Sequence, residues 1–504
     1  MTVVSTKTAS FQPVGTVTGL EELRGLVNAA IDVLQDVAMR RTGPVAPGGP
    51  VAARTAAAAA LPSCLLPSDA DARTPFTDMI RAYAQWSVDL SHPAALARMQ
   101  CPPAPVAVAA ELVVAALNQS LHAWESGPFA LELDRWVIEE LAAVVGYSDQ
   151  AGGTITAGGS ISNLMAVLVA RDNTLRAQLG LTAFQDGLAT LKKRPVVLCS
   201  PATHFSIGRG VGITGIGEQH ILRAPTDTVG RLIPSGVDRM LAELPEDQLP
   251  VMVIACAGAT DLGWVDDLPA LAEVARKHGV WLHADAAYGG GALFSDDLRG
   301  MLEGIAQADS VTLDLHKFGW TPASSAVFLV RDARTLDAMD QASTTLNAGD
   351  DKAAGFVGRY STSVQATRRV NALKIATTMQ ALGRDGMAAM VDECHFLARH
   401  AASRLDEAPG VELASRPPLS TVVFRFTPPP GVDADDFNGK LRRELMTSGK
   451  ALLARTSVPQ ENGASPVFLK MMLLNPATTV EELDTVIDEV LRFAASRQGV
   501  TDGP

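Results

Sequence analysis

The chain has 504 residues, of which 47% are hydrophobic and 19% are charged, and its formal net charge is −13. This length is sufficient for a large core and for two or three domains. The negative charge argues against nucleic acid or an anionic membrane as a partner, and no long uninterrupted apolar run predicts a membrane span.

The first hundred residues are predicted to be largely helical. Apolar residues recur at helical spacing over residues 20–41. Residues 40–63 are rich in alanine, proline and glycine, so we expect a surface loop or linker there. We therefore predict that residues 1–100 form an N-terminal helical segment with a loop at 40–63. Helices are expected again from residue 104 to residue 145.

Further along the chain, short apolar runs alternate with helical stretches. The runs RPVVLCS, PVMVIACAGAT, GVWLHADAA and DSVTLDLH suit strands that are buried on both faces. This alternation predicts an α/β domain with a mostly parallel sheet, which we place at residues 101–387. The segments STVVFRFTP and VFLKMMLLN alternate as strands do, and TVEELDTVIDEVLRFAASR is an amphipathic helix. We predict a small C-terminal α+β domain over residues 388–504.

A glycine-rich turn, TAGGSISN, joins a predicted strand to a predicted helix. Gly159 and Ser160 stand where backbone N–H groups and the helix dipole face an anion, so the turn is able to hold a phosphate. Taken alone, the pattern is better explained by a tight turn with a serine N-cap.

Polar residues also close two of the apolar runs. Asp285 ends WLHAD, and a buried carboxylate needs a cationic partner such as a protonated pyridine nitrogen. An aspartate that caps the next element is an equally good interpretation. Ala287 would leave a flat surface for a ring. His204 follows VVLCS and could stack on an aromatic cofactor, although a lone loop histidine more often has a structural role.

Lys317 closes the run VTLDLHK, next to His316. An ε-amine in a partly apolar site forms a Schiff base with an aldehyde, whereas the alternative is a lysine that reaches from a strand end into water. The phosphate turn, the histidine, the aspartate and the lysine follow one another along the chain. Together they are the set that pyridoxal 5'-phosphate requires.

The segments TAGGSISNLMAVLVARD, HADAAYGGG and DSVTLDLHKFGWTPASSAVFLVRD resemble the group II pyridoxal-phosphate-dependent amino acid decarboxylases. Four other segments resemble the branch that includes L-2,4-diaminobutyrate decarboxylases and siderophore-pathway lysine decarboxylases: SHPAALARMQCPP, AALNQSLHAWESGPFALELDRWVIEEL, SVQATRRVNALKIATTMQALG and FLKMMLLNPATTVEELD. The resemblance covers residues 90–495. It implies a fold-type I, aspartate aminotransferase-like α/β domain with a mostly parallel seven-stranded sheet. It also implies a homodimer, in which residues 1–100 take part, with active sites at the interface.

The resemblance further implies roles for individual residues. Lys317 forms the Schiff base with pyridoxal 5'-phosphate, Asp285 pairs with the pyridine nitrogen, and His204 stacks on the ring. The other implied cofactor contacts are Gly159 and Ser160 at the phosphate, His316 nearby, and Thr260 and Ala287 against the ring. No metal is implied.

The reaction implied is decarboxylation of an L-amino acid, and a mobile loop often supplies the proton donor as a tyrosine. The segment DDKAAGFVGRYSTSVQATRR corresponds to that loop, so Tyr360 is the candidate acid. A lid residue without a chemical role is the alternative. If Tyr360 lies outside the site, the chemistry would turn to oxidative deamination or aldehyde synthesis.

The favoured substrate is aliphatic with a polar or charged side chain, such as 2,4-diaminobutyrate or a lysine-like amino acid. A glutamate- or aspartate-type substrate is the alternative, and a non-catalytic paralogue is disfavoured by the presence of Lys317 with its partners. Candidate substrate contacts are His92, Gln119 and Trp124, although His92 with Pro93 is also explained as a helix cap. Five cysteines without CxxC spacing argue against disulfides and zinc and favour a cytoplasmic protein, and the alanine- and arginine-rich composition is typical of GC-rich bacteria.

Overall fold

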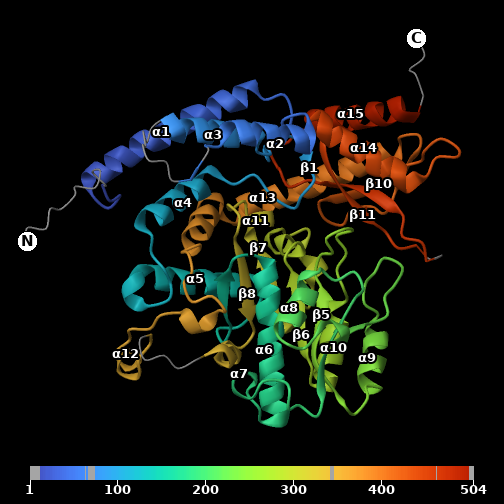
Figure 1. Ribbon diagram of the computed structural model, residues 1–504. Helices are drawn as coiled ribbons and strands as arrows, with labels where there is room; N and C mark the ends of the chain where they lie inside the picture. Colours follow the sequence, from blue (N-terminus) through green and yellow to red (C-terminus); the bar gives the residue numbers. More distant parts are fainter. Residues whose placement is uncertain (1–11, 63, 66–73, 341–345, 461–462, 499–504) are drawn as a thin grey trace, which may run out of the picture.

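A computed structural model describes residues 12–62, 64–65, 74–340, 346–460 and 463–498 (Figure 1). Within these residues the larger sheet has seven strands in the order β2-β8-β7-β6-β5-β3-β4. Strand β8 runs antiparallel to both of its neighbours, and the other pairs are parallel. The predicted mostly parallel, seven-stranded sheet is therefore confirmed. Its strands are β2 (Gly152–Thr156), β3 (Arg194–Cys199), β4 (Ile221–Arg223), β5 (Gln248–Cys256), β6 (Trp281–Ala286), β7 (Ser310–Asp314) and β8 (Ala326–Val330).

Helices cover both faces of this sheet, because successive strand residues point to opposite sides. In β8, Val327 and Leu329 join the core under one set of helices, and Phe328 and Val330 join the core on the other face. Helices α6 and α8 lie on the second face, and helices α5, α9, α10 and α13 lie on the first. Their bounds are α5 (Pro128–Val145), α6 (Gly159–Leu179), α8 (Ser206–Ile213), α9 (Pro234–Ala242), α10 (Leu268–His278) and α13 (Ala372–Asp406).

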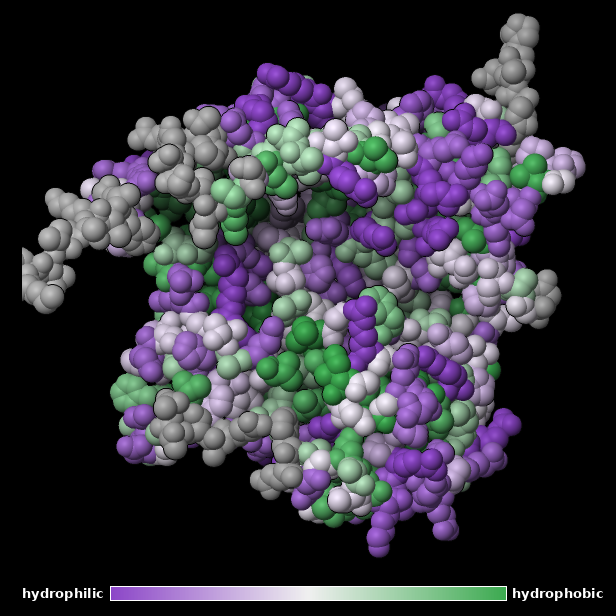
Figure 2. Space-filling view, viewed as in Figure 1, coloured by the Kyte–Doolittle hydropathy of each residue, from purple (hydrophilic) through white to green (hydrophobic). Residues whose placement is uncertain are grey.

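Outer helices such as α10 bury only the side that faces the large sheet. In α10, Leu268, Leu271 and Ala275 are buried at helical spacing, whereas Glu273 and Arg276 are exposed. Figure 2 shows mainly hydrophilic residues over α9 and α10.

A second sheet, in the order β1-β11-β12-β10-β9, is covered on one face by α14, α15 and the C-terminal part of α13. Phe424, Leu469 and Leu441 meet in its core. This arrangement agrees with the strands and the helix that the sequence predicts near the C-terminus. The elements are β1 (Ala95–Leu96), β9 (Val411–Leu413), β10 (Thr421–Phe426), β11 (Leu452–Ser457), β12 (Val467–Met472), α14 (Ala434–Ser448) and α15 (Val480–Gln498).

The division at residues 387/388 stays a prediction, since α13 runs through it as one element. The helix changes direction a few residues earlier, at Gly383, whose φ of 65° lies in the left-handed region. Strand β1 pairs in parallel with β11, so the end of the N-terminal segment contributes to the C-terminal sheet.

The predicted loop at residues 40–63 is wrong in its second half, where α2 (Gly49–Ala60) forms. Gly48 adopts a φ of 100° before the helix, and Pro50 occupies the first turn, where its missing N–H is not needed. The alanine run 56–60 has the highest helix propensity, and it outweighs the composition argument. Residue 63 lies outside the described residues.

The other helices of the N-terminal half are α1 (Val17–Arg40), α3 (Thr74–Trp86) and α4 (Pro105–Leu117). Shorter elements are α7 (Ala183–Asp186), α11 (Leu315–Phe318), α12 (Gly349–Ala353), η1 (Trp124–Ser126), η2 (Glu218–His220), η3 (Gly289–Phe294), η4 (Arg299–Leu302), η5 (Ile305–Gln307), η6 (Ala333–Met339) and η7 (Tyr360–Thr362). Among the helices of the described residues, none has the length and apolar character needed to cross a membrane.

We expect Phe424→Ala to lower the free energy of unfolding by about 3–5 kcal/mol, because Phe424 is fully buried in the second core. The exposed Val432 is the matched control, and Val432→Ala should change the free energy by no more than about 0.5 kcal/mol. Urea denaturation would measure both. Equal losses in the two variants would contradict the assignment of this core.

Candidate active site

A cavity of about 330 Å³ lies where β5, β6 and β7 end and where α6 begins. Ligands of α/β sheets bind at the carboxyl ends of parallel strands, so this is the expected position for a site. Eight of the residues that the sequence singled out line it: Gly159, Ser160, His204, Thr260, Asp285, Ala287, His316 and Lys317. The structure brings these side chains together, and their chemical roles stay predictions.

Lys317 is the third residue of α11, the short helix that begins directly after the buried strand β7. Its Nζ lies 3.0 Å from Oδ2 of Asp314, the last residue of the strand, and His316 Nε2 lies 3.7 Å from the same oxygen. The His316 ring is fixed on its other side, where Nδ1 lies 2.8 Å from the carbonyl oxygen of Ser325. The lysine is therefore paired at the edge of the cavity.

The glycine-rich turn places the N-terminus of α6 at the cavity. Gly158 has a φ of 118°, which favours glycine. A Cβ at Gly159 would lie 2.9 Å from Asp314 Oδ1, so a larger residue there would have to displace the carboxylate that pairs with Lys317. Ser160 in the first turn adds a hydroxyl beside the free N–H groups of the helix. These donors suit a phosphate.

Asp285 near the end of β6 has both carboxylate oxygens held by N–H donors. Asn163 Nδ2 donates to Oδ2 at 2.8 Å, and the backbone N–H of Ala287 donates to Oδ1 at 3.2 Å. Both donors are uncharged. The carboxylate is thus fixed in orientation and keeps its negative charge available to a cationic partner in the cavity.

His204, after β3, is held by Ser206 at the start of α8. The backbone N–H of Ser206 donates to His204 Nδ1 at 3.3 Å, and Ser206 Oγ lies 2.8 Å from the same nitrogen. Burial is the largest influence on this ring and lowers its pKa below the ordinary value of 6.5. At neutral pH the ring is therefore uncharged and carries its proton at Nε2.

Four predicted site residues are not among those that line this cavity: His92, Gln119, Trp124 and Tyr360. His92 Nδ1 accepts the backbone N–H of Ala94 at 3.1 Å, which caps a turn before β1. Gln119 is exposed in the connection after α4, and the Trp124 ring lies 4.9 Å from the ring of Phe356.

Tyr360 begins η7 in the predicted lid segment. The chain is anchored to β2 of the same subunit on both sides of Tyr360. Arg359 donates to the carbonyl oxygen of Gly153 at 2.6 Å, and Arg368 donates to Thr154 Oγ1 at 2.5 Å. Arg359 also pairs with the buried Asp134 at 3.0 Å. The backbone around Tyr360 is therefore held against the edge of the large sheet.

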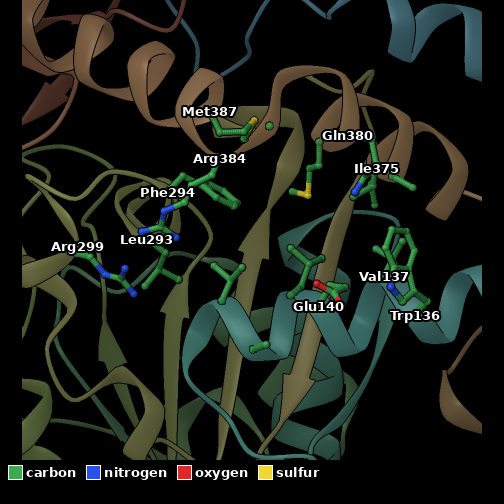
Figure 3. Close-up of a pocket in the computed structure, with 16 residues that line it drawn as sticks. Trp136, Val137, Glu140, Leu293, Phe294, Arg299, Ile375, Gln380, Arg384 and Met387 are labelled. Carbon is green, nitrogen blue, oxygen red and sulfur yellow. The ribbon is translucent and has the colours of Figure 1, made fainter.

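A larger cavity of about 420 Å³ lies between α5, α13 and η3 (Figure 3). Its walls are mainly apolar, with Val137, Phe294 and Met387 among them, and Glu140 and Arg384 are also present. None of the sequence-predicted site residues lines it, and its lining includes no lysine that could react with an aldehyde. It is therefore not the cofactor site.

Sequence reasoning missed the residues that hold Asp285 in place. Asn163, His283 and Thr312 are buried, and hydrogen bonds join Asn163 to the other two and to Asp285. Asn163 also lines the cavity. His283 lies two residues before Asp285 in β6, a spacing that places both on one side of the strand. Asp314 was also missed as a partner of Lys317, although its position three residues before the lysine is a usable signal.

Three comparisons with known proteins agree with this geometry. The family model described as the pyridoxal-dependent decarboxylase conserved domain matches residues 66–427. The chain is 36% identical to an L-2,4-diaminobutyrate decarboxylase of Rhizobium meliloti (strain 1021) over 403 residues, which cover 80% of the chain and 78% of the relative. It is 32% identical to the Acinetobacter baumannii enzyme of the same name over 426 residues, with 82% of each covered.

Solved structures match over nearly the whole chain. The glutamate decarboxylase domain of a diaminobutyrate-pyruvate transaminase and L-2,4-diaminobutyrate decarboxylase from Vibrio parahaemolyticus superposes with a TM-score of 0.83 at 27% identity, covering 95% of this chain and 97% of that one. Oryza sativa TDC with PLP and tryptamine has a TM-score of 0.84 at 22% identity, with 97% and 100% covered, and shows the fold alone. The predicted fold-type I architecture is confirmed.

We expect acid to destabilise the protein partly through His283. Burial lowers the pKa of His283 from 6.5 to about 4. Between these values the unfolded chain binds a proton that the folded chain does not, so the free energy of unfolding falls as the pH drops through this window. His283→Gln should reduce the loss between pH 7 and pH 4 by about 3 kcal/mol. Urea denaturation at both pH values would measure it, and identical losses in the two proteins would disprove this assignment.

Proposed function

This chain belongs to the pyridoxal-dependent decarboxylase family, and from that premise we propose that it acts on L-2,4-diaminobutyrate or an amino acid of similar shape and charge. It is a pyridoxal phosphate-dependent amino acid decarboxylase. The observation that carries the substrate proposal is the similarity to two L-2,4-diaminobutyrate decarboxylases over about four fifths of the chain.

The residues of the cavity fit the cofactor. A lysine, a carboxylate held by neutral donors, a histidine ring and a helix N-terminus with a hydroxyl surround one space of about 330 Å³. When bound, pyridoxal phosphate supplies an aldehyde that reacts with amines and a ring that spreads the charge left by the departing carboxylate. In this proposal Lys317 holds the aldehyde, Gly159 and Ser160 hold the phosphate, and His316 lies beside them. Thr260 and Ala287 line the space for the ring.

Two side chains would tune the ring. Asp285 holds a proton on the pyridine nitrogen as its ion-pair partner, since both carboxylate oxygens are already oriented by N–H donors. His204 lies against the ring as a neutral imidazole with its proton at Nε2. Asp314 pairs with the Lys317 ammonium at 3.0 Å and keeps this amine at the cavity while the substrate amine is in place.

Tyr360 is proposed as the group that delivers a proton to the substrate α-carbon. It is not among the residues that line the cavity of its own chain. We therefore propose a homodimer in which the lid segment of one subunit enters the cavity of the other. Trp124 touches the lid through Phe356 and would belong to the same interface. The scattered cysteines and the bacterial relatives support a cytoplasmic bacterial enzyme.

The first test is a product assay. Protein loaded with pyridoxal phosphate would be incubated in air with L-2,4-diaminobutyrate, ornithine, lysine, glutamate, aspartate or an aromatic amino acid, and products would be read by mass spectrometry. We expect an amine that has lost only CO₂, with the highest kcat/KM for diaminobutyrate. Lys317→Ala should form no product, because no amine remains to hold and release the cofactor.

The outcome for each substrate decides a separate part of the proposal. A preference for glutamate or aspartate would overturn the proposed substrate but would still support decarboxylation as the reaction. An aldehyde with ammonia and peroxide would replace decarboxylation by oxidative deamination. Activity of Lys317→Ala equal to that of the wild type would refute the site.

We expect Tyr360→Phe to lower kcat for decarboxylation by about 10²-fold, because general acid catalysis typically contributes at least this much. Aldehyde should rise as a share of the product, since a substrate α-carbon that receives no proton would be exposed to oxygen for longer. The matched control is Tyr83→Phe on α3, where Tyr83 is exposed. Unchanged kcat and product ratio for Tyr360→Phe would show that this tyrosine has no chemical role.

A further inference from the structure

Asn163, in the second turn of α6, joins two of the side chains proposed to touch the cofactor. Its side chain is buried, and Nδ2 donates both of its hydrogens: to Asp285 Oδ2 at 2.8 Å and to Ser206 Oγ at 2.9 Å. Ser206 is in turn the partner of His204. One amide group therefore connects the carboxylate of Asp285 in β6 with the imidazole of His204, which lies between β3 and α8.

The orientation of this amide is determined by its surroundings. Its oxygen faces Thr312 Oγ1, which donates at 3.1 Å, and His283 Nε2 at 3.1 Å. The carboxylate of Asp285 accepts and cannot donate, so the amide nitrogen must face it. The amide oxygen then faces His283, and His283 Nε2 must carry a hydrogen.

The hydrogen bonds on the other side of the His283 ring agree with a hydrogen at its Nε2. Trp281 Nε1 can only donate, and it donates to Ser310 Oγ at 2.9 Å. The Ser310 hydroxyl hydrogen is then free to point at His283 Nδ1, which lies 2.9 Å away. His283 is neutral at pH 7, and its single N–H, at Nε2, donates a hydrogen bond to Asn163 Oδ1. Every polar atom in this series has a partner.

The near end fixes the tautomer of His204. The backbone N–H of Ser206 donates to His204 Nδ1, so this nitrogen is an acceptor. The Ser206 hydroxyl hydrogen also points to Nδ1, which leaves its oxygen free to accept from Asn163. The proton of His204 is thereby kept at Nε2.

We propose that Asn163 is a positioning residue that orients Asp285 and, through Ser206, His204 as one hydrogen-bonded unit for the cofactor ring. This inference rests on the proposed function, because the unit has a purpose only if a ring binds between these side chains. Asn163 is also among the residues that line the cavity, but both hydrogens of its amide group are donated to Asp285 and Ser206. Its proposed role is therefore to hold Asp285 and His204 in fixed orientations.

The test measures the affinity of the apoprotein for pyridoxal phosphate and the pH dependence of the absorbance of the bound cofactor. Asn163→Ala removes both donors. Asn163→Asp is nearly isosteric and keeps an oxygen toward His283 and Thr312, but it cannot donate to Asp285 as a carboxylate. We expect both to raise Kd by about 10- to 100-fold, the range for a lost hydrogen bond to a charged group. Both should also shift the pH profile of the absorbance.

Asn438 provides the matched control. It is equally buried, and its side chain makes three hydrogen bonds, to the backbone of Phe426 and of Ala434, in the C-terminal core. Asn438→Ala should destabilise the protein and leave both Kd and the pH profile within twofold of the wild type. Ser206→Ala removes the hydroxyl that joins Asn163 to His204 and keeps the bond from Asn163 to Asp285. It should raise Kd by at least about fivefold, the effect of losing one neutral hydrogen bond.

The outcomes separate this inference from the proposed function. A wild-type protein that binds no pyridoxal phosphate would overturn both. Tight wild-type binding with unchanged Kd and pH profile in the Asn163 variants would overturn the positioning role alone, as would an equal loss in Asn438→Ala. If Asn163→Ala does not fold, Asn163→Asp is measured in its place. If neither Asn163 variant folds, Ser206→Ala decides the question. An unchanged Kd for pyridoxal phosphate in this variant refutes the connection from Asn163 to His204, and a raised Kd supports it.

Discussion

The site depends on the parallel register of β5, β6 and β7. This register places Cys256 beside Asp285 and Asp285 beside Thr312, so polar side chains from three strands meet at one edge of the sheet. The strands are covered on both faces, and a shift of one residue would turn Asp285 to the opposite side and leave buried backbone groups unpaired. The cavity is therefore a consequence of strand pairing, with loops and helix ends completing its walls.

Two helices on one face of the sheet, α6 and α8, complete the site at this edge. Helix α6 brings its N-terminus to the cavity and places Asn163 one turn deeper. Helix α8 must approach α6 closely for Ser206 to reach Asn163, and Gly210 permits it, since a Cβ there would lie 3.3 Å from the Cα of Leu164. The tight packing of these helices and the hydrogen bonds behind Asp285 are thus parts of the same arrangement.

Site residues could be predicted from the sequence where a polar residue ends an apolar run. Lys317 and Asp285 could be found because each ends an apolar run, and parallel strands bring such ends together. Asn163 was missed because its partners lie 122 and 43 residues away, and only the folded chain makes them neighbours. The helix α2 was missed because proline and glycine suggested a loop, although both stand at its start. His92, Gln119 and Trp124 could not be placed in a substrate pocket, since such a pocket in this proposal needs a second subunit.

The cavity holds two carboxylates, Asp285 and Asp314, and their surroundings give them different tasks. Asp314 faces the Lys317 ammonium at 3.0 Å, so its charge is balanced within the chain. Asp285 is oriented by an amide and a backbone N–H, which fix its position without supplying a positive charge. A cation that enters the cavity is thus attracted most strongly by Asp285. In the proposed function, the protonated nitrogen of the cofactor ring would pair with Asp285 and the aldehyde would meet Lys317, and the neutral donors at Asp285 would leave its negative charge for that nitrogen.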